Sequence, residues 1–314
     1  MKIYHNIPDN KNIFINPVIT IGTFDGVHIG HRKILSTLLD TAAEKRGDPV
    51  VITFSSHPRK TLNPELTIKI ITTTEEKIDA IYNFGIPNII ILNFTKQMAQ
   101  MPAIDFYNEI LIRKLDAKYI VIGYDHAFGK NREGNYGFLT QLTLKSGIET
   151  VRVEEEDLFS RPVSSSWIRE ELESGNIEKA NSLLGWRYSI SGSVVRGKGR
   201  GRDLGFPTAN ISPFNREKII PGDGVYAVSV ILENGNKKMG MLNIGNNPTF
   251  SDGSDSIEVN ILDFNDTIYD APITVEFHSR IREEIKFSSP EQLKDQIKKD
   301  RIATLHLLGT LNDK

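Results

Sequence analysis

Two histidines near the start of the chain stand three residues apart in a glycine-rich stretch. Residues 22–31 read GTFDGVHIGH, and the histidines are His28 and His31. A β-branched run precedes this stretch and a helical pattern follows it. Both side chains would therefore lie on one face near a helix N-terminus, where the helix dipole favours phosphate. Imidazoles and backbone N–H groups placed there could stabilise the charge that develops when the α-phosphate of a nucleotide is attacked.

A second stretch, in the other half of the chain, combines glycines, basic residues and hydroxyl groups. Residues 192–202 read GSVVRGKGRGR, which taken alone is a weak indication of a phosphate-binding loop. Residues 204–210, LGFPTAN, follow directly and make the combination more specific. Thr208 and Asn210 stand two residues apart on a predicted strand and so share one face. Their side-chain oxygens are hard ligands of the kind that a nucleotide-bound Mg²⁺ accepts.

Glu258 lies on a predicted strand in which apolar and polar residues alternate. The residues at 257, 259 and 261 are apolar and those at 258 and 260 are polar, so Glu258 would face away from the apolar side. A glutamate in such a position is usually a solvated side chain, but it could also act as the general base for a hydroxyl nucleophile. The acidic run at residues 154–157 is interpreted as a solvated loop.

The first stretch resembles a known nucleotide-binding element. Its HxGH pattern is similar to that of the nucleotidyltransferase superfamily, and the longer string resembles the adenylyltransferase half of prokaryotic bifunctional FAD synthetases. Three further segments are similar to that family in the same order: TFSSHP at 53–58, GYDHAFG at 123–129, and SSSWIR at 164–169. The resemblance implies that a phosphate oxygen of FMN attacks the α-phosphate of ATP, so that this step needs no general base.

The same resemblance implies roles for individual residues of the first half. Charge stabilisation in catalysis falls to His28, His31 and Arg169. The implied ATP-binding residues are Gly22, Phe24, Asp25, Gly30, Ser164, Ser165 and Arg169. The implied flavin-binding residues are His57, Pro58, Asp125 and Phe128.

The second half resembles riboflavin kinases through their PTAN motif at residues 207–210. The similarity continues in order through residues 224–227, 243–250, 258–264 and 281–287. It implies that Glu258 is the general base for the ribityl 5′-hydroxyl of riboflavin and that Thr208 and Asn210 hold Mg²⁺ with ATP. The implied ATP-binding residues are Gly197, Lys198, Gly199, Thr208 and Asn210. The implied flavin-binding residues are Arg282 and Phe287.

Two positions depart from the family pattern and leave an alternative open. His126 stands where the family usually has phenylalanine, and Ser166 where it usually has threonine. Serine keeps the hydroxyl group, but His126 puts a polar ring near the expected flavin. The alternative is a flavin-binding regulatory or salvage protein with riboflavin kinase activity and a weakened adenylyltransferase domain. An aminoacyl-tRNA synthetase fragment, suggested by the letters HIGH, lacks a KMSKS-like partner and tRNA-binding charge.

The elements that must position these residues differ between the two halves. Short β-branched runs at residues 18–21, 50–54, 89–94, 119–122 and 149–153 are typical of buried parallel strands. Helical patterns at 75–84 and 104–115 lie between them. Such alternation predicts an α/β doubly wound nucleotidyltransferase domain over residues 1–185. Its ligands would gather at the carboxyl ends of the strands.

Residues 186–314 are predicted to form a riboflavin kinase domain, a small antiparallel β-barrel or sandwich with a C-terminal helix. Two short helices, at 164–174 and 176–184, precede the predicted boundary near Gly185. Strands separated by Gly, Pro and Asn follow, and the ENGN at 233–236 favours a hairpin with a type I′ turn. Residues 290–308 have the pattern of a long helix.

Composition limits the environment and the partners. The chain of 314 residues has no cysteine, which excludes disulfides and thiolate metal sites. Its 38 basic and 40 acidic residues give a net charge of −2, so the chain as a whole has no electrostatic attraction for nucleic acid or an anionic membrane. No apolar run suggests a membrane span or a signal peptide. We expect a cytoplasmic monomer or weak homo-oligomer that binds riboflavin, FMN and ATP, with Mg²⁺ as the only added cofactor.

Overall fold

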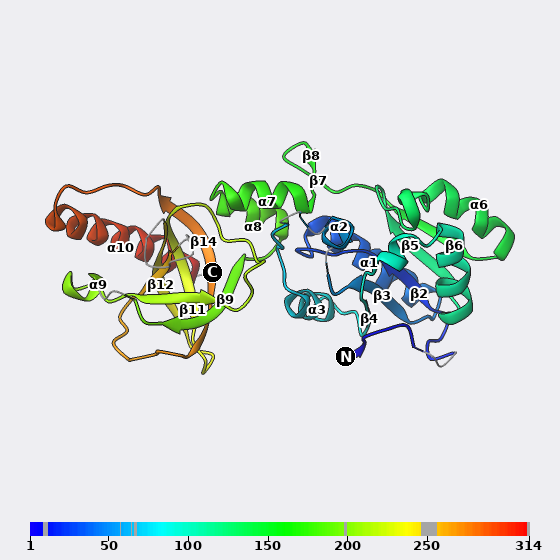
Figure 1. The fold of residues 1–314 in the computed structure, drawn as a ribbon, viewed down its shortest axis with the longest axis horizontal. Coiled ribbons are helices and arrows are strands. Elements are labelled where there is room, and N and C mark those ends of the chain that lie inside the picture. The colour runs from blue at the N-terminus through cyan, green and yellow to red at the C-terminus, as the bar shows by residue number, and fades with distance from the viewer. Residues whose placement is uncertain are drawn as a thin grey trace. The chain divides into compact units, whose positions relative to one another are not determined.

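The chain forms two compact units, Met1–Ser165 and Ser166–Lys314, in the computed structural model (Figure 1). The structure describes residues 1–8, 12–56, 58–63, 65, 68–197, 200–245 and 256–312. The contacts divide the chain before its paired short helices, whereas the boundary predicted from the sequence, near Gly185, follows them. The boundary near Gly185 stays a prediction.

The first unit is built on a parallel six-stranded sheet with the order β1-β4-β3-β2-β5-β6. Its strands are β1 (Lys2–Tyr4), β2 (Val18–Ile21), β3 (Pro49–Phe54), β4 (Asn88–Leu92), β5 (Tyr119–Gly123) and β6 (Glu149–Val153). The chain runs from β2 to β3 and β4 on one side and then crosses to β5 on the other side of β2. Ligands of doubly wound sheets bind at such a switch point, outside the carboxyl ends of the strands.

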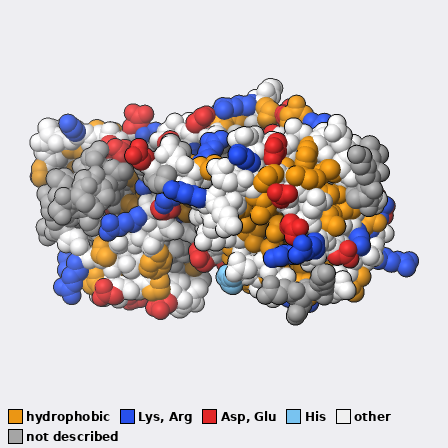
Figure 2. All heavy atoms as spheres, turned by 45° about the vertical axis from the view of Figure 1, so that its right-hand side comes forward, with side chains coloured by type: hydrophobic (Ala, Val, Ile, Leu, Met, Phe, Trp, Pro, Cys, Tyr) orange, Lys and Arg blue, Asp and Glu red, His pale blue; other side chains and the backbone are white. Residues whose placement is uncertain are grey.

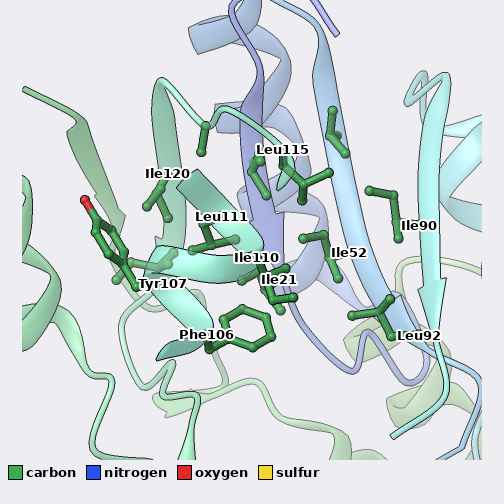
Figure 3. Packing of buried hydrophobic residues seen from close by; sticks show 14 of the residues in the cluster. Ile21, Ile52, Ile90, Leu92, Phe106, Tyr107, Ile110, Leu111, Leu115 and Ile120 are labelled. Carbon is green, nitrogen blue, oxygen red and sulfur yellow. The ribbon is translucent and has the colours of Figure 1, made fainter. Parts of the chain in front are cut away.

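Apolar side chains cover both faces of this sheet, as the doubly wound prediction requires. One cluster joins Ile21 and Ile52 to Phe106, Tyr107 and other residues of the segment that follows β4 (Figure 3). The opposite cluster joins buried leucines and isoleucines of α1 and α3 to the sheet. The helices of this unit are α1 (Ile29–Glu44), α2 (Pro58–Leu62), α3 (Thr74–Asn83), α4 (Lys96–Ala99), α5 (Ala103–Asp105), η1 (Phe106–Lys114), η2 (Lys130–Arg132) and α6 (Tyr136–Ser146).

The helix predicted at 104–115 differs in its winding. After the single turn of α5 it continues as the π-helix η1, with the N–H of Leu115 bonded to the carbonyl of Ile110. A two-stranded hairpin, β7 (Asp157–Leu158) and β8 (Arg161–Pro162), lies near the end of this unit. The helix α7 (Ser165–Glu173) begins at the division between the units.

The second unit contains a closed antiparallel barrel with the order β10-β13-β12-β11-β14-β9. Its strands are β9 (Ser189–Val195), β10 (Ala209–Pro213), β11 (Gly224–Ile231), β12 (Lys237–Gly245), β13 (Ser256–Ile261) and β14 (Pro272–Arg282). Because β9 pairs with β10 as well as β14, the sheet closes on itself. Besides α7, the helices of this unit are α8 (Ile177–Leu184), the short α9 (Arg200–Asp203) and the predicted C-terminal helix, α10 (Pro290–Asn312). The fold class predicted from the sequence is confirmed, with a barrel rather than a sandwich.

The hairpin between β11 and β12 has a different turn from the predicted type I′. Gly235 has a φ of 80°, but Asn234 does not have a positive φ. The N–H of Gly235 bonds to the carbonyl of Leu232, and the N–H of Leu232 bonds to the carbonyl of Asn236. The turn is therefore a longer one in which glycine alone occupies the left-handed region.

Candidate active sites

The segment 22–27, which we call the phosphate loop, joins β2 to α1 in a strained conformation. Phe24 and Val27 have positive φ values of 50° and 38°, and Gly26 has 87°. A side chain at Gly22 would lie 2.8 Å from the ring of Phe24, so glycine is needed there for the ring to pack. Non-glycine residues in this region are uncommon and gather at functional sites.

The two histidines of the HxGH pattern lie against one another at the start of α1. His28 precedes the helix as its N-cap, and its Nδ1 accepts a hydrogen bond from the N–H of His31 at 3.3 Å. The two rings stack with centroids 3.6 Å apart. The edge of Phe24 packs on the ring of His31 at 5.1 Å. The predicted pair is therefore brought together, with His28 outside the helix and His31 in its first turn.

The surroundings of the His31 imidazole favour its neutral form. Burial lowers its pKa well below the usual value, and the neighbouring His28 and Lys77 lower it further. Its Nδ1 has no hydrogen-bond partner among the residues that the structure describes. A neutral imidazole keeps one N–H group, and at a helix N-terminus this group can donate a hydrogen bond to a phosphate oxygen.

Asp25 holds the phosphate loop in place. Its carboxylate is 5% exposed and accepts hydrogen bonds from the N–H of Ile71 and the N–H and hydroxyl of Thr72, at 3.0 to 3.2 Å. The hydroxyl of Thr72 accepts in turn from the N–H of Gly26 at 2.9 Å. Ser165, the last residue of the first unit, donates to the backbone carbonyl of Asp25 at 2.9 Å. The resemblance implied that Asp25 binds ATP, but its carboxylate accepts hydrogen bonds from the protein itself.

Lys77, in the first turns of α3, was missed by the sequence analysis. It is 6% exposed, and its ammonium donates to the carbonyls of Thr23 and Phe54 at 3.1 and 2.7 Å. The sequence did contain one indication that Lys77 is buried. It stands beside Ile78 and four residues before Ile81, on the buried face of the helix. A lysine on such a face needs a reason, since burial opposes its charge.

The loop after β5 supplies the other predicted groups of the first unit. Phe128 packs on Phe106 at 5.3 Å, and Arg132 donates to the backbone carbonyl of Asp125 at 2.9 Å. Burial lowers the pKa of His126 to about 4, and its Nε2 has no hydrogen-bond partner within the described ranges.

The segment after β3 holds two further predicted flavin contacts. Pro58 begins α2 after β3, and His57 lies outside the described residues. β2, β3 and β5 are parallel neighbours, so the segments that follow them share one edge of the sheet.

The remaining predicted ATP contacts fall in different units. Gly30 lies in the first turn of α1, where a side chain would lie 3.3 Å from the ring of His28. Ser164 belongs to the first unit and directly precedes α7. Arg169 lies in α7 within the second compact unit and stays a predicted contact.

The second site lies in the barrel, where Glu258 of β13 pairs in register with Asn210 of β10. Thr208 donates its hydroxyl hydrogen to Oε2 of Glu258 at 3.1 Å. Asn210 is 5% exposed, and its Oδ1 has no hydrogen-bond partner in the part of the chain that the structure describes. A side chain at Gly197 would lie 2.1 Å from the Asn210 amide. Lys198 and Gly199 lie outside the described residues.

The unpaired buried amide oxygen of Asn210 and the hydroxyl of Thr208 have the chemistry of magnesium ligands. Buried polar atoms are rarely left without a partner unless a water, ion or ligand supplies one. Amide and hydroxyl oxygens are among the ligands that hard cations accept. Thr208 and Asn210 therefore have the donor chemistry that Mg²⁺ with ATP would need.

Glu258 and Thr208 also line a pocket of about 350 Å³ between barrel strands and α10. The other polar side chains in its wall are Asn243, Asn260, Arg282, Glu284 and Asp300. Apolar side chains of the segment before β10, of the strands, of the segment after β14 and of α10 complete it: Leu204, Phe206, Val225, Met241, Ile285, Phe287, Leu293 and Ile297. A mostly apolar wall with a few polar groups is typical of small-molecule sites of this size.

The predicted flavin residues of the second half meet in this wall. The guanidinium of Arg282 lies 5.8 Å from the ring of Phe287 and forms a salt bridge with Asp300 of α10 at 2.8 Å. Asp300 is 3% exposed and also accepts from the amide of Gln296 at 2.8 Å. The sequence analysis did not find Asp300, because its partner is on another element.

Known proteins match both halves of the chain in the order of these two sites. A family model of FAD synthetase matches residues 11–167, and one of riboflavin kinase matches residues 184–308. The bifunctional riboflavin kinase/FMN adenylyltransferase of Bacillus subtilis (strain 168) is 38% identical over 94% of this chain and 93% of its own. The chain belongs to the bifunctional riboflavin kinase/FMN adenylyltransferase family. The family predicted from the motifs is thereby confirmed.

Other relatives extend over the same length. The bifunctional riboflavin kinase/FMN adenylyltransferase of Listeria monocytogenes is 35% identical over 99% of this chain and 98% of its own. A crystal structure described as a macrolide-efflux protein from Streptococcus pneumoniae matches with a TM-score of 0.86 and 33% identity. It covers 96% of this chain and 98% of that chain. Among the described residues, no helix has the length and apolar character needed to cross a membrane.

Proposed function

We propose that this member of the family makes FAD from riboflavin in two ATP-dependent steps, one in each half of the chain. The barrel site would transfer a phosphoryl group to riboflavin, and the site after β2 would transfer an adenylyl group to FMN. The observation that carries the proposal is the occurrence of two separate sites, each within a segment that matches one of the two enzyme families. In the view of Figure 2, basic and acidic side chains are mixed over the described residues, and no large patch of one charge is seen.

In the kinase step, Glu258 would accept the proton of the ribityl 5′-hydroxyl. The oxygen then attacks the γ-phosphorus of ATP, the bond from that phosphorus to the bridging oxygen breaks, and FMN and ADP are formed. Thr208 and Asn210 would hold Mg²⁺, which when bound offsets the negative charge of the phosphates. The unpaired Oδ1 of Asn210 and the hydrogen bond between Thr208 and Glu258 support this arrangement.

In the adenylyl step, an FMN phosphate oxygen would attack the α-phosphorus of a second ATP, and pyrophosphate would leave. The nucleophile is already an anion, so no base has to remove a proton. His28 and His31 would donate hydrogen bonds to the oxygens on which charge develops, in a loop that Asp25 and Ser165 keep in shape. Arg169 and Ser164 remain proposed ATP contacts.

His126 supports the second candidate, a protein with an active kinase and a weakened adenylyltransferase. Its buried Nε2 without a described partner lies in the loop that should face the flavin. A polar atom left unpaired there would oppose an apolar ring system unless the flavin supplies its partner.

A product profile distinguishes the two candidates. The full chain would be incubated with riboflavin, ATP and Mg²⁺, and in a parallel reaction with FMN in place of riboflavin, and the flavins would be separated by chromatography. We expect FMN and FAD from the first mixture, and FAD with pyrophosphate from the second. Accumulation of FMN without FAD in both reactions would favour the regulatory or salvage protein.

A further inference from the structure

Lys77 joins the phosphate loop to the end of a neighbouring strand. Its ammonium donates to the carbonyl of Thr23, in the loop after β2, and to that of Phe54, the last residue of β3. The hydroxyl of Thr53 also donates to the Thr23 carbonyl, at 3.2 Å. Two donors therefore fix the orientation of the peptide group between Thr23 and Phe24.

That orientation determines where the next N–H points. In a trans peptide the carbonyl and the following N–H lie on opposite sides of the C–N bond. With the Thr23 carbonyl turned toward Lys77, the N–H of Phe24 points away from it. This N–H has no hydrogen-bond partner among the described residues. Phe24 is 1% exposed, so this N–H is a buried donor in the loop that begins the HxGH segment, and a phosphate oxygen bound at the loop would supply its partner.

Lys77 is an unfavourable residue for its position unless it has such a role. It is 6% exposed and forms no salt bridge within the described ranges. Burial lowers its pKa to about 8, although the more distant Asp25 and Glu75 act to raise it. An apolar side chain of similar length would fit a buried face of α3 at a lower cost. A buried cation at the ligand edge of a sheet is a reason to look for a function.

The adenylyl-transfer site also needs a positive charge to offset the negative charges of its substrates. ATP and FMN bring several negative charges to the loop, while burial and the neighbours of His31 lower its pKa and favour its neutral form. An ammonium under the loop attracts phosphates strongly, since little water lies between them.

We propose that Lys77 is a positioning residue of the adenylyl-transfer site, which orients the Phe24 N–H through the Thr23 carbonyl and places a positive charge beneath the phosphate loop. The inference rests on the proposed function of the HxGH segment. The chemical class that this charge would favour is a nucleoside triphosphate.

The test compares Lys77→Met with wild type in the full chain, with FMN and ATP as substrates. We expect kcat/KM for ATP in FAD formation to fall by at least about tenfold, since loss of a charge-stabilising donor lowers rates by about 10²–10³. Riboflavin phosphorylation by the same preparation should stay within about twofold of wild type. Lys114→Met, at an exposed lysine of η1, is the matched control and should change neither activity.

The pH profile separates an electrostatic role from a purely structural one. The titratable and charged groups that face Lys77 are Asp25 of the loop, Glu75 of α3 and His31 of α1. Below its pKa of about 8 Lys77 is charged, and above it the charge is lost, so ATP affinity of the wild type should fall on the alkaline side. His31 titrates on the acid side and cannot cause that step. Lys77→Met should show low affinity with no alkaline step, and Lys77→Arg should keep part of the affinity without the step.

Three outcomes decide between the hypotheses. If His31→Ala leaves FAD formation intact, the proposed site itself is wrong. If His31→Ala abolishes FAD formation while Lys77→Met keeps wild-type kcat/KM for ATP, the proposal for Lys77 is wrong and the site stands. If Lys77→Met and Lys77→Arg are both inactive and the wild type has no alkaline step in ATP affinity, Lys77 serves folding and the proposal is overturned.

Discussion

Thr208 and Glu258 share a hydrogen bond of 3.1 Å, in which the hydroxyl of the proposed metal ligand donates to the carboxylate of the proposed base. The bond holds Oε2 of Glu258 toward the residues expected to meet ATP. A substitution at either residue also removes a hydrogen-bond partner of the other, so the roles of Thr208 and Glu258 need separate tests.

Replacing Glu258 by glutamine should lower the kcat of riboflavin phosphorylation by about 10²–10⁴-fold, because the amide keeps the shape but cannot accept the proton. The KM values should change little, since the lost interaction is made mainly in the transition state. FAD formation from added FMN should continue. Initial rates of both reactions measure this, with Glu233→Gln in the exposed turn after β11 as control. Retention of more than about half of kcat would contradict the proposed base, and Asp263 would be tested next.

Replacing Asn210 by alanine should raise the Mg²⁺ concentration needed for half-maximal kinase activity. The reason is the loss of the buried amide oxygen that lacks a protein partner. The measurement is a Mg²⁺ titration at fixed ATP and riboflavin, with Asn210→Asp as the matched variant that keeps an oxygen. An unchanged Mg²⁺ requirement in Asn210→Ala would remove Asn210 from the metal site.

Replacing Asp300 by alanine should destabilise the second unit by roughly 3 kcal/mol, the usual loss when one partner of a buried ion pair is removed. Arg282 bonds both carboxylate oxygens, at 2.8 to 3.0 Å, and the two side chains are 16% and 4% exposed. Both tryptophans of the chain, Trp167 and Trp186, belong to this unit, so urea unfolding followed by tryptophan fluorescence reports on it. Asp295→Ala, at an exposed aspartate of α10, is the control. Equal midpoints for the two variants would mean that the pair adds no stability.

A fragment that starts at residue 166 should be more stable than one that starts at 186. Ile177, Ala180, Leu183 and Leu184 of α8 are fully buried, and Asn181 bonds the backbone of both Tyr188 and Phe277. Each large apolar side chain contributes about 1.5–3 kcal/mol when buried, so the shorter fragment should lose several kcal/mol. Thermal unfolding and riboflavin kinase assays of both fragments measure this. If residues 186–314 alone unfold at the same temperature, α7 and α8 are not part of the kinase domain.

His126→Phe should stabilise the first unit, and more so at low pH. The phenylalanine removes a buried nitrogen that has no described partner. In the wild type, the pKa of His126 is lowered to about 4 in the folded state, so the unfolded chain binds the proton more readily. Stability should therefore fall as the pH drops from about 6.5 toward 4, and less in the variant. Hydrogen exchange of peptides covering residues 119–135, measured at pH 7 and pH 5, tests this.

The rate of FAD formation by His126→Phe bears on the second candidate function. A variant that forms FAD faster than wild type would support the weakened-adenylyltransferase alternative.

Much of the architecture could be predicted because it is local. β2 and β6 begin and end at the predicted residues, since buried parallel strands are short apolar runs. β1 was missed, because its three residues are partly exposed and are a strand only through pairing with β4. The π winding of η1 likewise leaves no mark in the periodicity of its residues.

The proximity of His28 and His31 could be predicted because both lie in one motif, and the fold stacks their rings. Thr208 and Glu258 lie in two motifs that the resemblance assigns to one site, and the structure joins them by a hydrogen bond. The contacts of Lys77 and Asp300 could not be predicted, because their partners are on other elements: the carbonyls of Thr23 and Phe54 for Lys77, and Arg282 of β14 for Asp300. Backbone carbonyls leave no pattern in the sequence, and the resemblance implied a flavin contact for Arg282, not a salt bridge.

The closure of the barrel restricts how copies of this chain could associate. Each of the six barrel strands has a neighbour on both sides, so none offers a free row of backbone donors and acceptors to another chain. The sheet of the first unit is open and ends at β1 and β6. Strand addition between copies, whether in regulated assembly or in aggregation during folding, is therefore open to the adenylyltransferase half and closed to the barrel.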